Sequence, residues 1–536
     1  ALFAAQGGVT VNRFLIDSGS VQFAANASTL ADGFLDRLNV ELSLAPTQDA
    51  RLELPFGTTA TTIAGASLTV AYNAGQSGDW QSNLRLGDLR SANMQLDELS
   101  LQASGTVQNI NDPVQRNVTF QFDGAMNGIE ATKPALAKAL GSRISTSGAG
   151  NWSDALGLKI DEFSVNGETL SVQSSGTVAE AAFNGTIELD TADLNAFSFL
   201  AGRRLGGSTG LVAQGSIGLI NGSFDLTVEG TGQSITLDNE TVDTLLRGKT
   251  SLFGGVSRST EGLSFRNFVV SNDQVELNLN GRFASEVADL EGKALIRNLA
   301  SINSNGSGAL VLDLSLTGQQ RPFDLTTKLS LEEGRLSGKP VRDVVLLFDG
   351  VTDGATLRGN LSGDGFIDRQ RLALSGRIEV DEQAKRLTGF NLNIGATDIT
   401  GNLARSGDGL IDAVIEVQSR DISAAAALGL VKASGQLNGT VRLQPAPSGT
   451  QSATVKMQAR DVVFEDIRVG SADVDADISE LFRLPGIDGT ISARSVIFGG
   501  FNIQTIDSTI ITTGDVTTFD LKAALAQNNT TLSTSG

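Results

Sequence analysis

The sequence contains no cysteine and no histidine among its 536 residues. The absence of cysteine excludes disulfide bonds, thiol nucleophiles and zinc sites built on thiolates. The absence of histidine removes the usual general base and the most common metal ligand. A chain without stray thiols also suits an oxidising compartment, where cysteines would cross-pair during slow β-sheet folding. We therefore predict a protein that is not an enzyme, with no catalytic residue, cofactor or metal site.

Two of the three aromatic residue types are also rare, with 1 Tyr and 2 Trp against 25 Phe. Phe has no polar tip and favours wholly apolar surroundings. The Trp and Tyr girdles of a membrane barrel are missing, and only Tyr72, Trp80 and Trp152 are available to stack on a sugar. No apolar run reaches the ~18 residues of a membrane-spanning helix. No charged leader segment is visible, so we expect a section of a longer protein.

Basic residues are in the minority, with 40 Lys and Arg against 60 Asp and Glu, and the formal net charge is -20. A chain of this sign repels phosphate backbones and flat anionic membrane surfaces. We therefore expect no nucleic-acid partner. Solubility is the simplest account of the acidity.

Alternation of apolar and polar residues with a period of two dominates the sequence. It is clearest in Val118, Phe120 and Phe122; in Phe224, Leu226 and Val228; in Val275, Leu277 and Leu279; and in Leu310, Leu312, Leu314 and Leu316. Such alternation places one face of each strand on an apolar side and the other in water, as in antiparallel sheets. With only 9 prolines to interrupt the ladders, we predict an all-β fold of roughly 45–65 short strands.

Turn signals agree with this prediction. The sequence has seven Asn-Gly and seven Asp-Gly pairs, and such pairs close tight hairpins because they accept positive φ. We expect turns at Asn166-Gly167, Asn221-Gly222, Asp349-Gly350 and Asp488-Gly489.

A short motif, apolar-x-apolar-x-Gly-x-apolar, recurs along the chain. Its glycines include Gly281, Gly376 and Gly435. Each stands where an alternating side chain would otherwise fall, so it marks either a bulge that curves the sheet or a plain turn. The spacing between copies is not constant, which excludes a tight β-solenoid and favours a long meander.

A few stretches carry helix signals. Residues 131–142, 193–204 and 421–431 have suitable start and stop residues, with Asp193 and Asp421 as candidate N-caps, and 241–247 is weaker. We interpret them as plugs or boundaries between strand groups. Residues 444–451, with two prolines, are the best candidate for a joint. We divide this continuous array into sections 1–130, 131–206, 207–440 and 441–536.

Possible chemical motifs are weak. Asp473, Asp475 and Asp477 alternate with apolar residues, so we expect them on one solvated strand face. They also lack the glycine of a calcium loop. Gly248-Lys249-Thr250 lacks the earlier glycine of a phosphate-binding loop. Serine and threonine are plentiful, but no histidine is present to activate them.

The apolar face of the predicted sheet is the remaining candidate site. A stripe of this kind is normally core, but 45 strands at ~4.8 Å would extend it to roughly 200 Å with few helices to cover it. It must close on itself, pair with a second sheet or carry apolar material. The predicted lining residues are Val118, Phe120, Phe122, Phe224, Leu226, Val228, Phe265, Val275, Leu277, Leu279, Leu312, Leu314, Leu372 and Leu374.

Several passages resemble the TamB family, the inner-membrane subunit of the translocation and assembly module, related to AsmA-like, bridge-like lipid-transfer proteins. Residues 245–283 have that family's order of a helix end, a hairpin and a strand ending in glycine, and residues 160–178 repeat the second half. Residues 459–508 carry the pattern of a strand pair, a short helix with Leu-Pro and a Gly-Gly turn. The resemblance covers nearly the whole chain, most weakly before residue 80.

The resemblance implies an elongated, incurled β-sheet that forms a groove shaped like a folded taco, with a few short helices. It implies phospholipid transport between the inner and outer membranes and a link to outer-membrane protein and autotransporter assembly. Phospholipid acyl chains would be the ligand, and a TamA-like outer-membrane barrel would be the partner of the full-length protein. The chain would be a monomeric middle segment in the periplasm of a Gram-negative bacterium, within an inner-membrane-anchored protein.

Two alternatives stay open. The sheet is also consistent with a scaffold that receives nascent outer-membrane strands by β-augmentation, which needs a long unpaired edge strand. It is further consistent with a closed-core adhesin or structural array, which needs two packed sheets and no continuous furrow.

Overall fold

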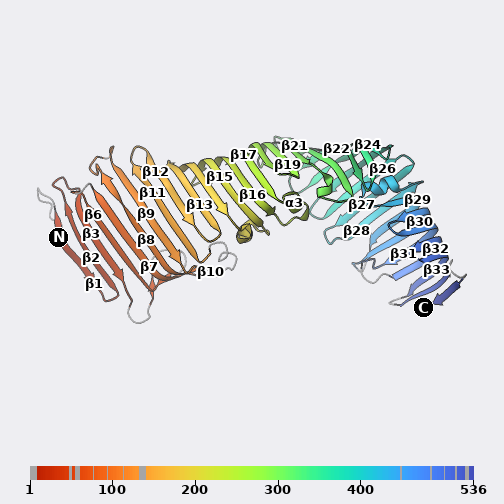
Figure 1. The fold of residues 1–536 in the computed structure, drawn as a ribbon, viewed down its shortest axis with the longest axis horizontal. Helices are drawn as coiled ribbons and strands as arrows, with labels where there is room; N and C mark the ends of the chain where they lie inside the picture. The colour runs from red at the N-terminus through yellow and green to blue at the C-terminus, as the bar shows by residue number, and fades with distance from the viewer. Residues whose placement is uncertain are drawn as a thin grey trace. The chain divides into compact units, whose positions relative to one another are not determined.

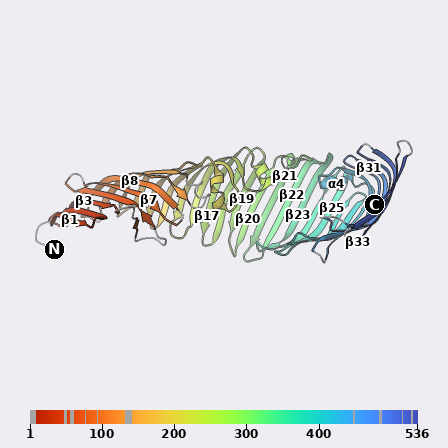
Figure 2. The same ribbon diagram turned by 90° about the horizontal axis from the view of Figure 1, so that it is seen from below.

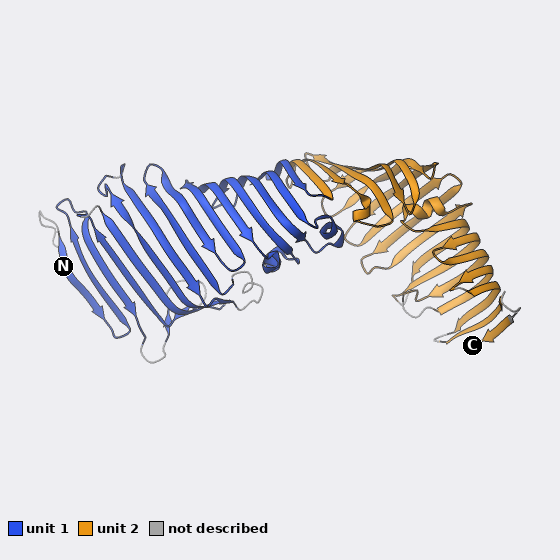
Figure 3. Ribbon diagram, viewed as in Figure 1, with its two compact units in different colours: residues 1–273 blue, residues 274–536 orange. Residues whose placement is uncertain are grey.

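Strands make up most of the computed structural model (Figures 1 and 2). The structure describes residues 9–46, 51–54, 61–75, 78–92, 94–112, 114–131, 141–446, 449–482, 486–499, 501–513, 516–525 and 530–536. The chain divides into two compact units, which comprise residues 1–273 (unit 1) and 274–536 (unit 2) (Figure 3). Each unit is built on an open antiparallel sheet, so the predicted all-β antiparallel class is confirmed.

Unit 1 contains strands β1 to β18. Its strands are β1 (Thr10–Asp17), β2 (Val21–Thr29), β3 (Leu35–Leu44), β4 (Leu52–Glu53), β5 (Thr62–Ile63), β6 (Gly65–Asn73), β7 (Asp79–Arg90), β8 (Met94–Gln108), β9 (Asn117–Asn127), β10 (Glu130–Ala131), β11 (Arg143–Ser153), β12 (Gly157–Asn166), β13 (Leu170–Ala179), β14 (Ala182–Thr191), β15 (Gly206–Gly218), β16 (Phe224–Thr236), β17 (Lys249–Ser259) and β18 (Gly262–Ser271). Consecutive strands pair, except that the short β4, β5 and β10 lie beside the ladder and β3 pairs with β6.

Unit 2 is a meander in which each strand pairs with the next. Its strands are β19 (Val275–Phe283), β20 (Ala288–Ile296), β21 (Gly306–Gly318), β22 (Phe323–Leu336), β23 (Lys339–Thr352), β24 (Leu357–Ile367), β25 (Gln370–Val380), β26 (Ala384–Ile394), β27 (Thr397–Ser406), β28 (Ile411–Ser419), β29 (Ala433–Pro445), β30 (Gln451–Phe464), β31 (Ile467–Ser479), β32 (Gly486–Phe498), β33 (Phe501–Thr513), β34 (Val516–Leu525) and β35 (Thr530–Ser535).

The strands are fewer and longer than the sequence predicted. The described residues form 35 strands, and the estimate of 45–65 was wrong because several predicted turns lie inside strands. Asn166-Gly167 and Asn221-Gly222 do lie at hairpin turns, whereas Asp349-Gly350 is within β23 and Asp488-Gly489 is within β32. An Asp-Gly pair in the middle of a strand therefore has a role other than turning the chain.

Neighbouring large side chains cover many of the mid-strand glycines. The ring of Phe348 lies beside Gly350 and Gly359. If these glycines carried a Cβ, the one on Gly350 would lie 2.8 Å from the ring and the one on Gly359 would lie 2.6 Å from it. Phe122 covers Gly148 in the same way. Large rings beside glycines on a sheet face restore contacts that the missing side chains would have made.

The motif glycines are strand residues and not plain turns. Gly281 lies inside β19, Gly376 lies where the pairing of β25 with β26 shifts, and Gly435 lies where the pairing of β29 with β30 shifts. Gly281 and Gly435 both have a φ of 107°, which a residue with a Cβ rarely adopts. Two of these three glycines thus mark the predicted bulges.

Each described helical segment is short and interrupts the meander, as predicted. The segments are η1 (Leu194–Phe197) and α2 (Ser198–Ala201), α3 (Glu240–Leu245), η2 (Leu299–Ser301) and α4 (Ser423–Leu428). Asp193 caps η1, accepting a hydrogen bond from the Asn195 N–H at 2.9 Å. Asp421 accepts one from the Ser423 N–H at 3.0 Å, although Ile422 is the N-cap of α4. The predicted helix at residues 131–142 lies mostly outside the described residues.

The helical segments of each unit lie at one edge of its sheet. In unit 1 they join β14 to β15 and β16 to β17, and in unit 2 they join β20 to β21 and β28 to β29. In a meander, every second connection falls at the same end of the strands. We call this end the helix edge and the opposite end, with its short connections, the hairpin edge. The predicted joint at residues 444–451 corresponds to the connection between β29 and β30 at the hairpin edge, because β29 extends to Pro445 and β30 starts at Gln451.

The sheet of unit 2 is curled. Eight strand-to-strand steps separate β21 from β29, which would be about 38 Å on a flat sheet. Yet Asn305, just before β21, donates a hydrogen bond from Nδ2 to the carbonyl oxygen of Leu430, just before β29, at 3.1 Å. The helix edge therefore curves until the segment before β21 contacts the segment between α4 and β29. This contact confirms an incurled sheet in this unit.

The largest buried cluster lies beneath this contact. Its buried members are Leu331, Leu336, Val341, Ile367, Leu372, Leu392, Ile394, Ala424, Ala425 and Ala427. Three of them are among the four alanines of α4, so the helix fills the curl as the predicted plug. Leu299 and Leu310 pack against the cluster from the other side.

Unit 1 has little core of its own. Among the described residues, its buried hydrophobic side chains are those of Ile63, Tyr72, Leu96, Ile129, Phe183 and Ala196. Much of the apolar face thus stays accessible.

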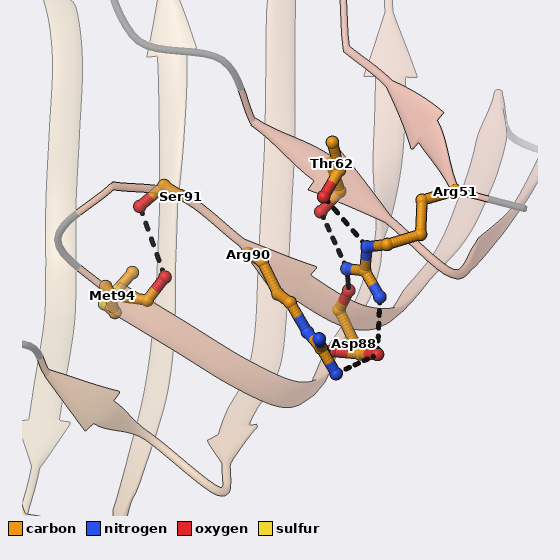
Figure 4. Close-up of polar contacts among 6 residues, drawn as sticks. All are labelled: Arg51, Thr62, Asp88, Arg90, Ser91 and Met94. Carbon is orange, nitrogen blue, oxygen red and sulfur yellow. Dashed lines mark hydrogen bonds and ion pairs between the residues drawn. The ribbon is translucent and has the colours of Figure 1, made fainter.

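A cluster of hydrogen-bonded polar side chains holds the paired strands β4 and β5 against β7 (Figure 4). Arg51 donates from Nη1 to Asp88 Oδ2 at 2.5 Å and from Nε to Thr62 Oγ1 at 2.9 Å. Arg90 donates to the same carboxylate at 2.8 and 3.0 Å. Hydrogen bonds from Arg90, and to a lesser extent from Arg51, keep the pKa of Asp88 below its usual value. The ionised carboxylate is therefore what ties the hairpin down.

We expect Arg51→Ala to speed amide exchange in β4 and β5 by about tenfold, because it removes several charge-assisted hydrogen bonds. Arg85→Ala, which changes an exposed arginine on β7, the strand that carries Asp88, is the matched control. Lowering the pH should also speed amide exchange in β4 and β5. The folded-state pKa of Asp88 is lowered, so its contribution to stability is present above the unfolded-state pKa and is lost as pH falls through the folded-state pKa. Unchanged exchange of the Leu52 and Ile63 amides in R51A would show that the Arg51 hydrogen bonds do not stabilise β4 and β5.

Candidate functional site

The apolar face of each sheet is the candidate site. All fourteen predicted lining residues lie on these faces, because the ladders place each of them opposite at least one apolar residue or glycine. They lie in β9, β16 and β18 of unit 1 and in β19, β21 and β25 of unit 2. The polar residues between them, such as Asp225 and Glu229, are exposed on the opposite face.

The register joins these residues into rows that run across the strands. In unit 2, one row crosses from β19 to β32 without a polar side chain. Its members are Leu277, Ala294, Leu312, Leu329, Leu346, Gly363, Leu374, Leu392, Ile399, Val417, Gly439, Met457, Val474 and Ile491. Residues far apart in sequence thus form a single apolar track.

Unit 1 has a comparable row that is rich in glycine. Its members from β9 to β18 are Phe120, Gly150, Ile160, Gly176, Gly185, Gly215, Leu226, Val256 and Phe265. The row beside it runs from Phe122 through Gly148 to Phe163, and the two rings lie 6.3 Å apart. The rings of Phe120 and Phe183 lie over two of the four glycines, Gly150 and Gly185, so aromatic rings cover part of this track.

The exposure of the lining residues varies along the faces. Most are half-buried, which is the state of side chains that pack sideways but lack a covering layer. Leu312 is 36% exposed, while Leu372 is 1% exposed in the cluster beneath α4. Leu372 therefore belongs to a closed core at the helix edge. A second buried cluster of Ala288, Leu316 and Phe323 lies at the hairpin edge, so the exposed part of the face near Leu312 lies between the two clusters.

Basic residues on the apolar faces were missed by sequence reasoning. In β11–β18 and β19–β34, the ladder positions in register with the apolar rows carry four charged side chains, namely Arg258, Lys339, Lys385 and Arg405. The alternation pattern contains the signal, since each stands where an apolar residue is due. Lys339 is paired with Asp368 at 2.6 Å.

The acidic stripe of β31 is a solvated face, as predicted. Asp473, Asp475 and Asp477 are exposed on the polar side of the strand, and Lys456 pairs with Asp475 at 3.2 Å. Among the described residues, no group of three or more Asp or Glu side chains is arranged to hold a metal ion. A hollow of about 370 Å³ on the polar face of unit 2 contains Lys293 and Asp313, which pair at 3.6 Å. Mutual ion pairing accounts for these charges.

No described helix is both long enough and apolar enough to cross a membrane. No protein-family model matches the sequence, and no curated protein matches it. The apolar rows and their open side are therefore the observations on which a function must rest.

Proposed function

We propose that the chain is a section of a hydrophobic conduit that carries phospholipid between two membranes, in the manner of the TamB family. The observation that carries the proposal is the unbroken apolar row of unit 2, together with the similar row of unit 1. Each acyl CH₂ removed from water gains about 0.8 kcal/mol. Because the rows offer similar apolar contacts at every strand, no position along them binds an acyl chain much more tightly than the next.

The sheet geometry favours this proposal over a closed-core array. An array of that kind needs two packed sheets, whereas each unit has a single open sheet and most of its apolar side chains are only half-buried. The proposed location is the periplasm of a Gram-negative bacterium, with a TamA-like outer-membrane barrel as partner of the full-length protein. A role in outer-membrane protein assembly belongs to the same proposal.

Photo-crosslinking along one strand tests the conduit. A photoreactive amino acid is placed in turn at each position from Phe224 to Glu229 of β16, and lipid adducts are read by mass spectrometry. We expect adducts at Phe224, Leu226 and Val228 only, because these face the apolar side. Adducts at every position, or at none, would contradict the conduit. Adducts with nascent outer-membrane strands in place of lipid would favour the strand-scaffold alternative.

A further inference from the structure

Lys385 and Arg405 are an unusual pair on the apolar face of unit 2. They lie directly opposite each other on β26 and β27, where Cβ atoms are about 5 Å apart. Like charges in this position destabilise a sheet. Acidic residues outnumber basic ones in the chain, 60 to 40, and yet two cations face each other on a surface that is mostly apolar.

Two carboxylates of the adjacent turns, those of Asp381 and Asp408, are engaged elsewhere, while Glu382 beside Asp381 is exposed. Asp381 accepts a hydrogen bond from Arg386 at 2.6 Å and others from the N–H groups of Gln383 and Ala384 at 2.8 Å. The hydrogen bond from Arg386, followed by the two backbone hydrogen bonds, lowers the pKa of Asp381 to about 2. Asp408 accepts from the Ser406 hydroxyl and from the Leu410 N–H.

Within the part of the chain that the structure describes, neither cation has an anionic partner of its own. Among the described residues, no ion pair joins Lys385 or Arg405 to a carboxylate. Both side chains are exposed. Two adjacent positive charges without a counter-ion form a site that an anion would stabilise.

The surroundings define what kind of anion fits. On the same face, Lys385 lies opposite Val380 and Arg405 lies opposite Ile411, and the next position inward pairs Leu387 with Leu403. Both cations are next to short turns at the hairpin edge, where the apolar face ends. A ligand that contacts both parts therefore has an anionic group joined to an apolar chain.

We propose that Lys385 and Arg405 bind the phosphate of a phospholipid at the hairpin edge of unit 2, while its acyl chains lie on the adjacent apolar face. This inference rests on the proposed conduit and adds a headgroup site to it. The Arg405 guanidinium can donate two parallel hydrogen bonds to a phosphate, and the Lys385 ammonium supplies a compact second charge. The phosphate in turn relieves the repulsion between the two cations.

Binding of soluble short-chain lipids to the full chain tests the site. The probes are dihexanoylphosphatidylglycerol below its micelle concentration, dihexanoylglycerol, which has the same chains without phosphate, and inorganic phosphate. The variant is K385E/R405E. The matched control is R442E/R460E, which makes the same change of charge at two exposed arginines on the polar face of β29 and β30. Circular dichroism checks that both variants keep their β content.

We expect K385E/R405E to weaken phosphatidylglycerol binding by about tenfold or more, the effect of losing charge-assisted hydrogen bonds. Dihexanoylglycerol binding should not change, and R442E/R460E should bind both lipids like the parent chain. Equal weakening in both double variants would overturn the site in favour of a general charge effect. Inorganic phosphate that binds as tightly as the lipid would show a free-phosphate site instead. Failure of the parent chain to bind either lipid would overturn the conduit itself.

Discussion

Leu312→Asp is expected to abolish lipid passage, whereas Leu347→Asp leaves it unchanged. Both residues are leucines in unit 2 that are 36% exposed. They differ in the face that they occupy. Leu312 is a member of the apolar row on β21, whereas Leu347 on β23 lies opposite Lys328 and Ser362 on the polar face. The pair therefore separates the role of the apolar face from the general cost of a new charge.

The physical reason is desolvation. An acyl chain that passes over the introduced carboxylate would have to strip water from it, and burying an unpaired charge is far more costly than the gain from a few methylene groups. Phe122→Asp in unit 1 and Leu279→Asp in unit 2 should interrupt their rows in the same way. In each case the β content should persist, because these side chains are not fully buried.

The measurement is lipid photo-crosslinking from Val228, in unit 1, and from Leu374, in unit 2, in the parent chain and in both variants. We expect at least about a tenfold loss of adducts at Leu374 in L312D, which corresponds to about 1.4 kcal/mol, and no loss in L347D. Similar adduct yields in the two variants would show that the apolar row is not a path for lipid.

Leu372→Ala is expected to loosen the helix edge of unit 2 more than any change on the open face. Leu372 is 1% exposed and packs in the cluster that includes the alanines of α4. Removing a fully buried leucine side chain costs about 2–5 kcal/mol, because a cavity adds to the lost transfer free energy. Leu329→Ala, on the half-buried part of the same face, should cost less because water already reaches the site.

Hydrogen exchange measured peptide by peptide is the suitable test, because a chain of this size with many local contacts is not expected to unfold in a single two-state step. The amides of α4 and of β25 should exchange faster in L372A, while those of β30 and β31 should change little. Equal effects of L372A and L329A would show that α4 does not seal a core. The hydrogen bond from Asn305 to the Leu430 carbonyl should weaken together with the cluster.

Much of the fold could be predicted from local patterns. Alternation in stretches such as Phe224, Leu226 and Val228 indicates which side chains share a face, because successive residues of a strand point to opposite sides. The helix signals near Asp193 and Asp421 were correct for the same reason, since capping is a local interaction. The Asp-Gly signal failed at Gly350 because Gly350 pairs with Gly359 of the adjacent strand β24 and the Phe348 ring covers both glycines, an arrangement that requires the adjacent strand.

The sequence by itself determined the strand class, the two faces and the absence of thiol and imidazole chemistry, because composition and period-two alternation depend only on the order of residues. Only the tertiary structure decided the register that aligns Leu277, Leu312 and Leu374 in one row, the burial of Leu372 beneath α4, and the meeting of Lys385 with Arg405. Each of these depends on which residues of neighbouring strands lie opposite each other. That pairing is set by bulges and by packing between strands, which no local pattern specifies.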